Sequence, residues 1–168
     1  AAYRLCDALP NLHFVMSVGL PADVPVASAY DTQMALMLEH TTKPIVFVTA
    51  DRASCQRAID MAAAVAGGPE ALVERQHILL YSEPSSPLQQ SETAVDKLLL
   101  MAERSLPVVH SPGPQMGATA PITMAGGLVM SLAEILSGLV VHQLKRPGAP
   151  FVFGAGLHHM DLKVAQIS

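Results

Sequence analysis

Two ionisable side chains stand where apolar runs of the sequence end, and both could take part in chemistry. Glu83 closes the run HILLYSEP, and His110 follows the two valines of PVVHSPG. A carboxylate at such a position is costly to bury unless it meets a cation. His110 could act as an acid–base group, although a single histidine is more often only hydrogen-bonded. Glu83 is therefore the more suggestive of the two residues.

A metal site is a second chemical possibility, raised by the segment HHMD with His158, His159 and Asp161. Adjacent residues on an extended chain point to opposite sides, so two neighbouring histidines rarely bind one ion together. Cys6 and Cys55 lie far apart and show no zinc-binding spacing. We interpret the histidines as ordinary loop residues and expect no bound metal.

The stretch HSPGPQMGATAPITMAGG, residues 110–127, holds several glycines and prolines where a short turn would suffice. It lacks the phosphate-loop pattern GxxxxGK[ST] and the dinucleotide pattern GxGxxG. What it offers is backbone N–H groups, the hydroxyls of Ser111 and Thr119, and little charge. Those groups suit a large ligand or a partner protein, and a plain turn remains the alternative.

The elements that must position these residues follow an alternating pattern. Apolar runs without polar alternation predict strands of a parallel sheet buried on both faces, and they begin at Leu12, Pro44, His77, Pro107 and Pro150. Helices are predicted between them over residues 30–40, 51–66, 91–104 and 123–145. Ligands then bind at the carboxyl ends of the strands.

Two α/β architectures fit this order of elements. One is a complete doubly wound sheet of five strands, and the other is about half of a (β/α)8 TIM barrel with five parallel strands. The first residues read like the end of a helix, and the last strand has no helix after it. The composition is 51% hydrophobic and 14% charged, whereas about 25% charged residues is typical. We favour the half-barrel, with residues 1–168 as one segment of a single domain.

Charge and hydropathy limit the partners. A net charge of −4 gives no basic footprint for nucleic acid. The apolar run Leu128–Val141 contains Glu134 and two serines and is shorter than the roughly 20 apolar residues of a membrane-spanning helix. We interpret it as a core-packed helix and expect no membrane association. Glu134 receives no role from the sequence. No signal peptide is recognised at the start, so a cytoplasmic location is expected.

Several motifs together resemble the trimethylamine methyltransferase family in order and spacing. They are NLHFVMSVGLPADVP, TTKPIVFV, MAAAVAGGPEAL, LLYSEPSSPLQQS and the long segment Pro107–Gly154. Family members are considerably longer, so the chain looks like an internal portion of one. The resemblance implies a (β/α)8 barrel that moves a methyl group from a methylated amine to the cobalt of a corrinoid carried by a separate small protein. The substrate, trimethylamine, glycine betaine or a similar amine, stays open, and any pyrrolysine should lie beyond Ser168.

The places of residues at the strand ends, taken together with the resemblance, lead to expected roles for individual residues. A quaternary ammonium prefers carboxylates and aromatic faces around it. The expected catalytic residues are Glu83, His110 and Asp161, and the expected substrate contacts are Tyr81, Ser86, Phe153 and His158. The loop residues expected to face the corrinoid are Ser111, Gly113, Gly117 and Thr119. The chain departs from the family pattern at MDLKVA, where MDMRTG is expected, and Lys163 keeps the positive charge there.

Two alternatives remain beside the enzyme. One is a non-catalytic protein that binds a methylated ammonium compound, and the other is a stand-alone flavodoxin-like module. For the enzyme we expect the segment alone to be inactive and a homo-oligomer to be possible. Replacement of Gly117 or Thr119 by valine should impair methyl transfer more than folding.

Overall fold

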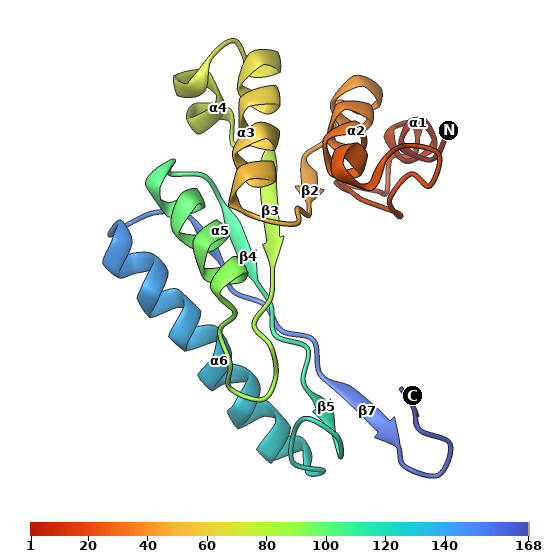
Figure 1. The fold of residues 1–168 in the computed structure, drawn as a ribbon, viewed down its shortest axis with the longest axis vertical. Coiled ribbons are helices and arrows are strands. Elements are labelled where there is room, and N and C mark those ends of the chain that lie inside the picture. Colours follow the sequence, from red (N-terminus) through yellow and green to blue (C-terminus); the bar gives the residue numbers. More distant parts are fainter. Residues whose placement is uncertain (168) are drawn as a thin grey trace.

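Five short strands pair side by side, all parallel, in the order in which they occur along the chain (Figure 1). The structure is a computed structural model and describes residues 1–167. The strands are β1 Val15–Met16, β2 Ile45–Phe47, β3 Ile78–Ser82, β4 Val108–His110 and β6 Phe151–Val152. In the register, Ile45 pairs with Ile78, and Val108 pairs with both Leu80 and Phe151. The predicted parallel sheet of five strands is confirmed.

The six helices are α1 Ala2–Ala8, α2 Val26–His40, α3 Arg52–Ala66, α4 Pro69–Arg75, α5 Glu92–Glu103 and α6 Met124–Lys145. A doubly wound sheet reverses its strand order at a switch point. The order β1-β2-β3-β4-β6 has no reversal. The doubly wound alternative is therefore wrong for this sheet.

The core lies between the helices and one face of the sheet. On β4, Val108 and His110 are fully buried, while Val109 between them is half-buried. Large buried side chains from the strands meet large buried side chains from the helices, among them Phe47, Ile78, Leu80, Met34, Leu98 and Met101. This alternation shows that the helices cover one face of the sheet.

The other face of the sheet is open. Phe14 is 56% exposed, Met16 38% and Val152 45%, and these side chains line a hollow of about 540 Å³. The prediction that both faces are buried is therefore wrong for residues 1–167. Parallel sheets normally have both faces covered by other elements. Within residues 1–167 no element covers the apolar residues of this face.

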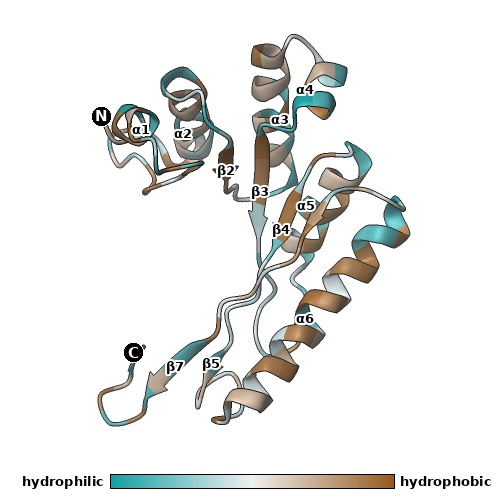
Figure 2. Cartoon of the chain, turned by 180° about the vertical axis from the view of Figure 1, so that it is seen from behind, coloured by the Kyte–Doolittle hydropathy of each residue, from teal (hydrophilic) through white to brown (hydrophobic). Residues whose placement is uncertain are grey.

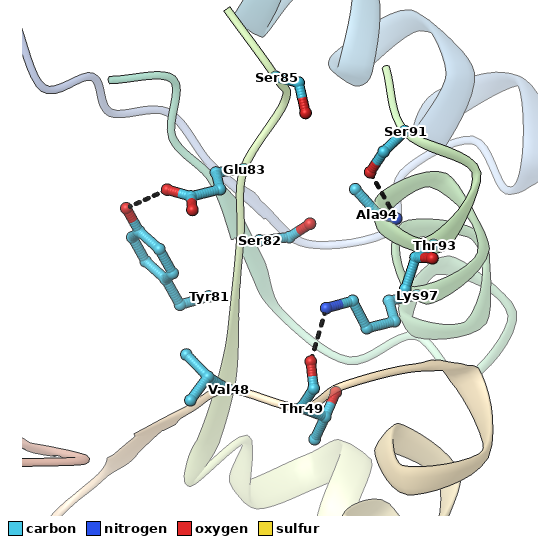
Figure 3. Close-up of a pocket in the computed structure, with 10 residues that line it drawn as sticks. All are labelled: Val48, Thr49, Tyr81, Ser82, Glu83, Ser85, Ser91, Thr93, Ala94 and Lys97. Atoms are coloured by element: carbon cyan, nitrogen blue, oxygen red, sulfur yellow. Dashed lines mark hydrogen bonds between the residues drawn. The ribbon is translucent and has the colours of Figure 1, made fainter. Parts of the chain in front are cut away.

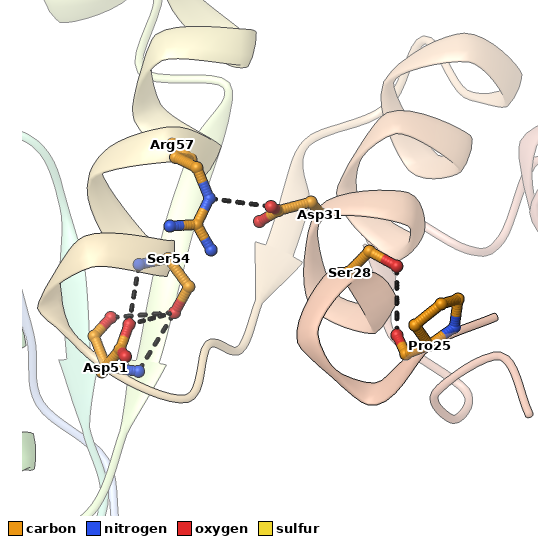
Figure 4. A network of polar contacts seen from close by, with 6 residues as sticks. All are labelled: Pro25, Ser28, Asp31, Asp51, Ser54 and Arg57. Carbon is orange, nitrogen blue, oxygen red and sulfur yellow. Dashed lines mark hydrogen bonds and ion pairs between the residues drawn. The ribbon is translucent and has the colours of Figure 1, made fainter.

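Local caps explain where the helices begin and end. Asp51 Oδ1 accepts a hydrogen bond from Ser54 N at 2.8 Å, and Ser54 Oγ accepts one from Asp51 N at 3.0 Å (Figure 4). This capping box starts α3, and Gly67 with a φ of 96° ends it. Arg57 then ties α3 to Asp31 of α2 at 2.7 Å. The predicted helix over residues 51–66 is confirmed.

Other boundaries differ from the prediction. Helix α2 begins at Val26 rather than at residue 30, and Ser28 Oγ donates to the carbonyl of Pro25 at its start. Helix α4 was not predicted. It begins at Pro69, directly after Gly68, and spans seven residues.

A second small sheet extends beyond the carboxyl ends of β4 and β6, and we call it the arm (Figure 1). It consists of β5 Gln115–Met116, β7 His158–Asp161 and β8 Gln166–Ile167. β5 pairs with β7 in parallel, and β7 pairs with β8 antiparallel. Since β4 and β6 are neighbours, the segments that follow them remain side by side and pair again. Segments expected to be loops are therefore strands.

Helix α6 runs along the molecule from the arm to the far end of the sheet (Figure 1). Within residues 1–167 it is the one helix long and apolar enough to cross a membrane. In Figure 2 the ribbon of α6 has the colour of hydrophobic residues along most of its length. Its buried positions, however, include Ser131, Glu134 and His142. These buried residues pack against the rest of the chain, whereas Val129, Val140 and Leu144 are more than half exposed, so α6 packs on the chain with one face only.

Candidate functional site

Three of the predicted site residues meet at the carboxyl edge of the sheet. The Tyr81 hydroxyl donates a hydrogen bond to Glu83 Oε2 at 3.2 Å. Burial and the nearby Glu83 carboxylate raise the pKa of Tyr81, and a hydrogen bond with the Ser111 side chain acts in the opposite direction. Ser111 is held there by its backbone N–H, which donates to the carbonyl of Ser82 at 2.9 Å. The edge therefore combines a protonated phenol with an exposed carboxylate.

A cavity of about 310 Å³ lies beside this group, between the ends of β2 and β3 and the start of α5 (Figure 3). Most of the residues that line it are of polar types, and the full set is Val48, Thr49, Tyr81, Ser82, Glu83, Ser85, Ser91, Thr93, Ala94 and Lys97. Ligands of α/β proteins bind at this edge of a parallel sheet. The cavity is therefore the candidate functional site.

Lys97 is a member of the site that the sequence analysis missed. Its Nζ donates a hydrogen bond to the backbone carbonyl of Thr49 at 2.8 Å, and Figure 3 shows it reaching from α5 toward the end of β2. Burial lowers the pKa of Lys97, while the negative charges of Asp51 and Glu83 act in the opposite direction. The ion pairs within residues 1–167 involve other side chains. Lys97 thus brings a positive charge without a carboxylate partner at ion-pair distance.

His110 lies on the helix side of the sheet. It is fully buried, its Nε2 is 3.0 Å from Gln90 Oε1, and its Nδ1 is 3.4 Å from Ser82 Oγ. Burial lowers the pKa of His110 to about 4, and the nearby His142 adds to the effect. The imidazole is therefore neutral at pH 7 and held by side chains of the core. This position does not support the predicted acid–base role and fits a hydrogen-bonded core histidine.

Ser86 binds a buried carboxylate rather than the cavity. Its Oγ donates to Glu134 Oε2 at 2.8 Å, and the backbone N–H of Leu88 donates to Glu134 Oε1 at 2.7 Å. The Gln90 amide donates to the backbone carbonyl of Glu134 at 3.1 Å. Glu134, for which no role was predicted, therefore anchors the loop between β3 and α5 on helix α6. The structure does not bring Ser86 to Tyr81 and Glu83 as a substrate contact.

The remaining predicted contacts belong to the arm or its base. Phe153 follows β6 and is 52% exposed. The backbone N–H of His158 donates to Pro114 at 3.2 Å, and Asp161 Oδ1 accepts from Lys163 N at 2.8 Å. In Figure 1 the arm extends away from the end of β3. The structure therefore does not bring Asp161 or His158 together with the Glu83 group.

The loop residues expected to face a corrinoid form a turn of their own. Gly117 has a φ of 88°, and its N–H donates to Ala120 at 2.9 Å. Thr119 Oγ1 accepts a hydrogen bond from Gln115 N at 2.9 Å. Gly113 lies beside the His158 ring. Because Gly117 and Thr119 shape the turn, valine at either position is expected to disturb local folding as well, contrary to the sequence-based expectation.

No group of three or more His, Cys, Asp or Glu side chains in residues 1–167 is arranged to hold a metal ion. Gly117 and Thr119 each make a hydrogen bond within their own turn, and these bonds fix the shape of the loop. Charged and hydroxyl groups that face a cavity occur instead around Tyr81, Glu83 and Lys97.

Comparison with known proteins shows which family this chain resembles. The family described as Trimethylamine methyltransferase (MTTB) matches residues 1–166. Trimethylamine methyltransferase MttB of Desulfitobacterium hafniense (strain DSM 10664 / DCB-2) is 32% identical over 160 residues, covering 95% of this chain and 32% of that protein. Trimethylamine methyltransferase MttB of Methanosarcina barkeri is 29% identical, covering 95% of this chain and 33% of its own length.

A protein named for another substrate is also similar. Glycine betaine methyltransferase of Desulfitobacterium hafniense (strain Y51) is 22% identical over 98% of this chain and 35% of its own length. The chain thus spans about a third of the length of the curated relatives it matches. The names of these relatives and the family that matches residues 1–166 both indicate a methyltransferase. The chain belongs to the trimethylamine methyltransferase family.

Proposed function

We propose that this chain is part of an enzyme that removes a methyl group from a small methylated amine, with Glu83 and Tyr81 at the ammonium group. The observation that carries the proposal is the pairing of an exposed carboxylate with an aromatic ring beside one cavity. A carboxylate attracts a permanent positive charge, and an aromatic face adds a cation–π contact. Methyl transfer is proposed because the chain belongs to the trimethylamine methyltransferase family.

We infer further that residues 1–167 are about half of a (β/α)8 barrel. The strands follow one another in chain order, the helices cover one face, and the open face is apolar. In a closed barrel the inner faces of all strands meet and fill the interior with side chains. The relatives are long enough to supply the remaining strands, since the chain spans about a third of their length.

The acceptor of the methyl group in this proposal is the cobalt of a corrinoid carried by a separate protein, as the resemblance of the motifs implies. When bound, that group supplies the nucleophile. The residues of this chain bind and orient the amine: Glu83 faces its charge, Tyr81 offers its ring, and Lys97 closes the other side of the cavity. Fixing the donor in this way lowers the entropic part of the barrier.

The test uses the protein in its full natural length, mixed with a reduced corrinoid protein and a panel that includes trimethylamine and glycine betaine. Formation of methyl-cobalt is followed by absorbance. We expect transfer with at least one amine, and we expect Glu83→Gln to lower its rate about 10- to 100-fold through loss of charge stabilisation. Glu39→Gln, an exposed carboxylate of α2, should leave the rate unchanged.

Two results would contradict the proposal. Absence of methyl-cobalt with every amine, although one of them binds, would indicate a non-catalytic binding protein. If Glu83→Gln transferred methyl groups at the same rate as the unmodified protein, the Glu83 carboxylate would not be part of the site.

A further inference from the structure

Helix α6 exposes a continuous row of large apolar side chains. Figure 1 and Figure 2 both show it at the edge of the molecule, and the elements within residues 1–167 that pack against it are chiefly α5, β4 and β5. Side chains four residues apart form a ridge on the surface of a helix. The ridge of α6 has five members, which are between 46% and 79% exposed: Leu128, Leu132, Leu136, Val140 and Leu144.

Closure of the proposed barrel covers only part of this ridge. One flank of α6 already packs beside α5, where Glu103 pairs with Lys145 at 2.8 Å. The next helix of a (β/α)8 barrel takes the other flank. At 3.6 residues per turn, Leu136 and Val140 lie nearly opposite the buried Gly138 and point away from both flanks. The middle of the ridge therefore stays on the outside of a closed barrel.

The exposed side of α6 offers no charge to a partner of a different kind. Between Met124 and Leu144 the ionisable residues are Glu134 and His142, and both are buried. A helix that lies on a membrane surface carries a polar face rich in Lys and Arg, which this stretch lacks. An uncharged apolar surface is complementary to another surface of the same composition.

The ridge is symmetrical about Leu136. Leu132 and Val140 lie four residues to either side of it, and Leu128 and Leu144 lie eight residues to either side. A two-fold axis at Leu136 therefore brings this side chain to its own counterpart, and Leu132 to Val140. Interfaces between two identical copies use the same patch on both. Ridges of this spacing also pack into each other at about −50°, the commonest class of helix packing.

The apolar area is sufficient for a specific interface. Full burial of one such side chain corresponds to roughly 60–120 Å² of apolar surface, so the ridge with its neighbours Met124 and Val129 exposes on the order of 300 Å². An interface of about 1,000 Å² in total, with roughly 60% of it apolar, needs about 300 Å² of apolar surface from each copy. Two copies of α6 meet this requirement.

We propose that α6 is the self-association surface of this protein, and that its ridge packs against the ridge of a second copy about a two-fold axis at Leu136. The interface lies on the outer side of the helix layer, whereas Tyr81 lines the open face of the sheet. Each copy therefore keeps its own site, and the contact joins two complete barrels.

The mass of the full natural-length protein in solution gives the first test, by size-exclusion chromatography with light scattering. The wild type should contain an even number of copies. Leu136→Glu places two like charges at the axis and should raise the dissociation constant at least about 100-fold, so that the mass falls by half. The matched control Val26→Glu changes a side chain that is 86% exposed on α2 and should keep the wild-type mass. A wild type that is a single copy, or an odd number of copies, would overturn the proposal.

An exchange of charges shows whether Leu136 meets its own counterpart. Leu136→Lys alone should dissociate like Leu136→Glu, and an equal mixture of the two variants should recover the wild-type mass because opposite charges then meet at the axis. Leu136→Ala adds no charge, and it should weaken association about 10-fold even if a charged variant folds poorly. Wild-type association of Leu136→Ala, or no recovery from a mixture of two folded variants, would contradict the proposed axis.

Other occupants of the ridge give different results. If another segment of the same protein covered it, Leu136→Glu would lower the free energy of unfolding and leave the mass unchanged. If a membrane covered it, the wild type would be a single copy that floats with vesicles of phosphatidylcholine and phosphatidylglycerol. Either result would overturn the proposal of a second copy.

Discussion

Glu134 is a charged residue inside an apolar helix, and its hydrogen bonds explain why it is there. Its carboxylate is 1% exposed and accepts from Ser86 Oγ and from the backbone N–H of Leu88. Both donors belong to the loop between β3 and α5, which begins with Glu83. The residue thus fixes the loop that borders the cavity, although it lies outside the cavity itself.

We predict that Glu134→Gln lowers the free energy of unfolding by about 1–3 kcal/mol, because an amide nitrogen would replace one of two acceptors and face a buried donor. Urea denaturation of the full-length protein measures the change. The control Glu39→Gln on the exposed side of α2 should stay within about 0.5 kcal/mol. Equal stability of the two variants would show that the loop does not depend on the carboxylate.

His110 predicts a dependence of stability on pH. Burial lowers its pKa from the usual 6.5 to about 4, so between these values the unfolded chain binds a proton that the folded protein does not. Stability attributable to His110 is therefore present above pH 6.5 and is lost as the pH falls toward 4, by on the order of 3 kcal/mol in full.

Comparison of the wild type with His110→Gln checks this prediction by denaturation at pH 7.5 and pH 5. The wild type should lose more stability on acidification than the variant. Burial also lowers the pKa of His77 and His142, so the stability of the variant should still depend on pH in part. A variant that loses as much stability as the wild type would contradict the burial argument.

At the scale of elements, local signals decided which parts of the fold could be predicted. Asp51, Ser91 and Thr123 cap their helices, and the three helices begin within one residue of the predicted positions. The arm has strands of only two to four residues, which exist because β4 and β6 are neighbours. Helix α4 is seven residues long, too short for a periodic signal.

Gly138 is the residue that allows α6 to approach β4. A Cβ atom at this position would overlap Cδ2 of the buried His110 ring. Gly127 works in the same way near the arm, where a Cβ atom would lie 2.9 Å from Met116 Cγ. Glycine is a poor helix former, so each of these two glycines lowers the stability of the helix. The close packing of the helix on the sheet explains why they are present.

We predict that Gly138→Ala lowers the free energy of unfolding by about 1–3 kcal/mol through overpacking, although alanine is the better helix former by about 1 kcal/mol. Chemical denaturation of the full-length protein measures it. The reverse change Ala133→Gly, on the exposed side of the same helix, isolates the propensity effect and should destabilise by about 1 kcal/mol. A Gly138→Ala protein more stable than wild type would mean that α6 does not pack tightly on His110.

At the scale of the whole molecule, the candidate site was predicted in part. Tyr81 lies at the end of β3, Glu83 follows β3 and Ser111 follows the neighbouring β4. Since strand ends in a parallel sheet meet at one edge, the proximity of these residues could be predicted. Lys97 could not be predicted, because it reaches the cavity only through the packing of α5 over the end of β2. Asp161 and His158 belong to β7 of the arm, which extends away from that edge, so the structure does not bring them to the Glu83 group.

The open face of the sheet tests the proposed barrel. Val152 is 45% exposed and lies with Val109 and Leu79 around the apolar hollow of about 540 Å³. If the face were open in the whole protein, a charge at residue 152 would be solvated at little cost. Inside a closed barrel the same charge would be buried without a partner.

We predict that Val152→Asp lowers the free energy of unfolding of the full-length protein by about 3 kcal/mol or more, because a carboxylate would enter a closed apolar interior. Denaturation and soluble yield measure the effect. Val26→Asp is the matched control, since Val26 is 86% exposed at the start of α2 and an acidic residue suits a helix N-terminus. The control should change stability by less than about 0.5 kcal/mol. Equal effects of the two substitutions would mean that the face stays open to water, and the half-barrel would then have to be abandoned.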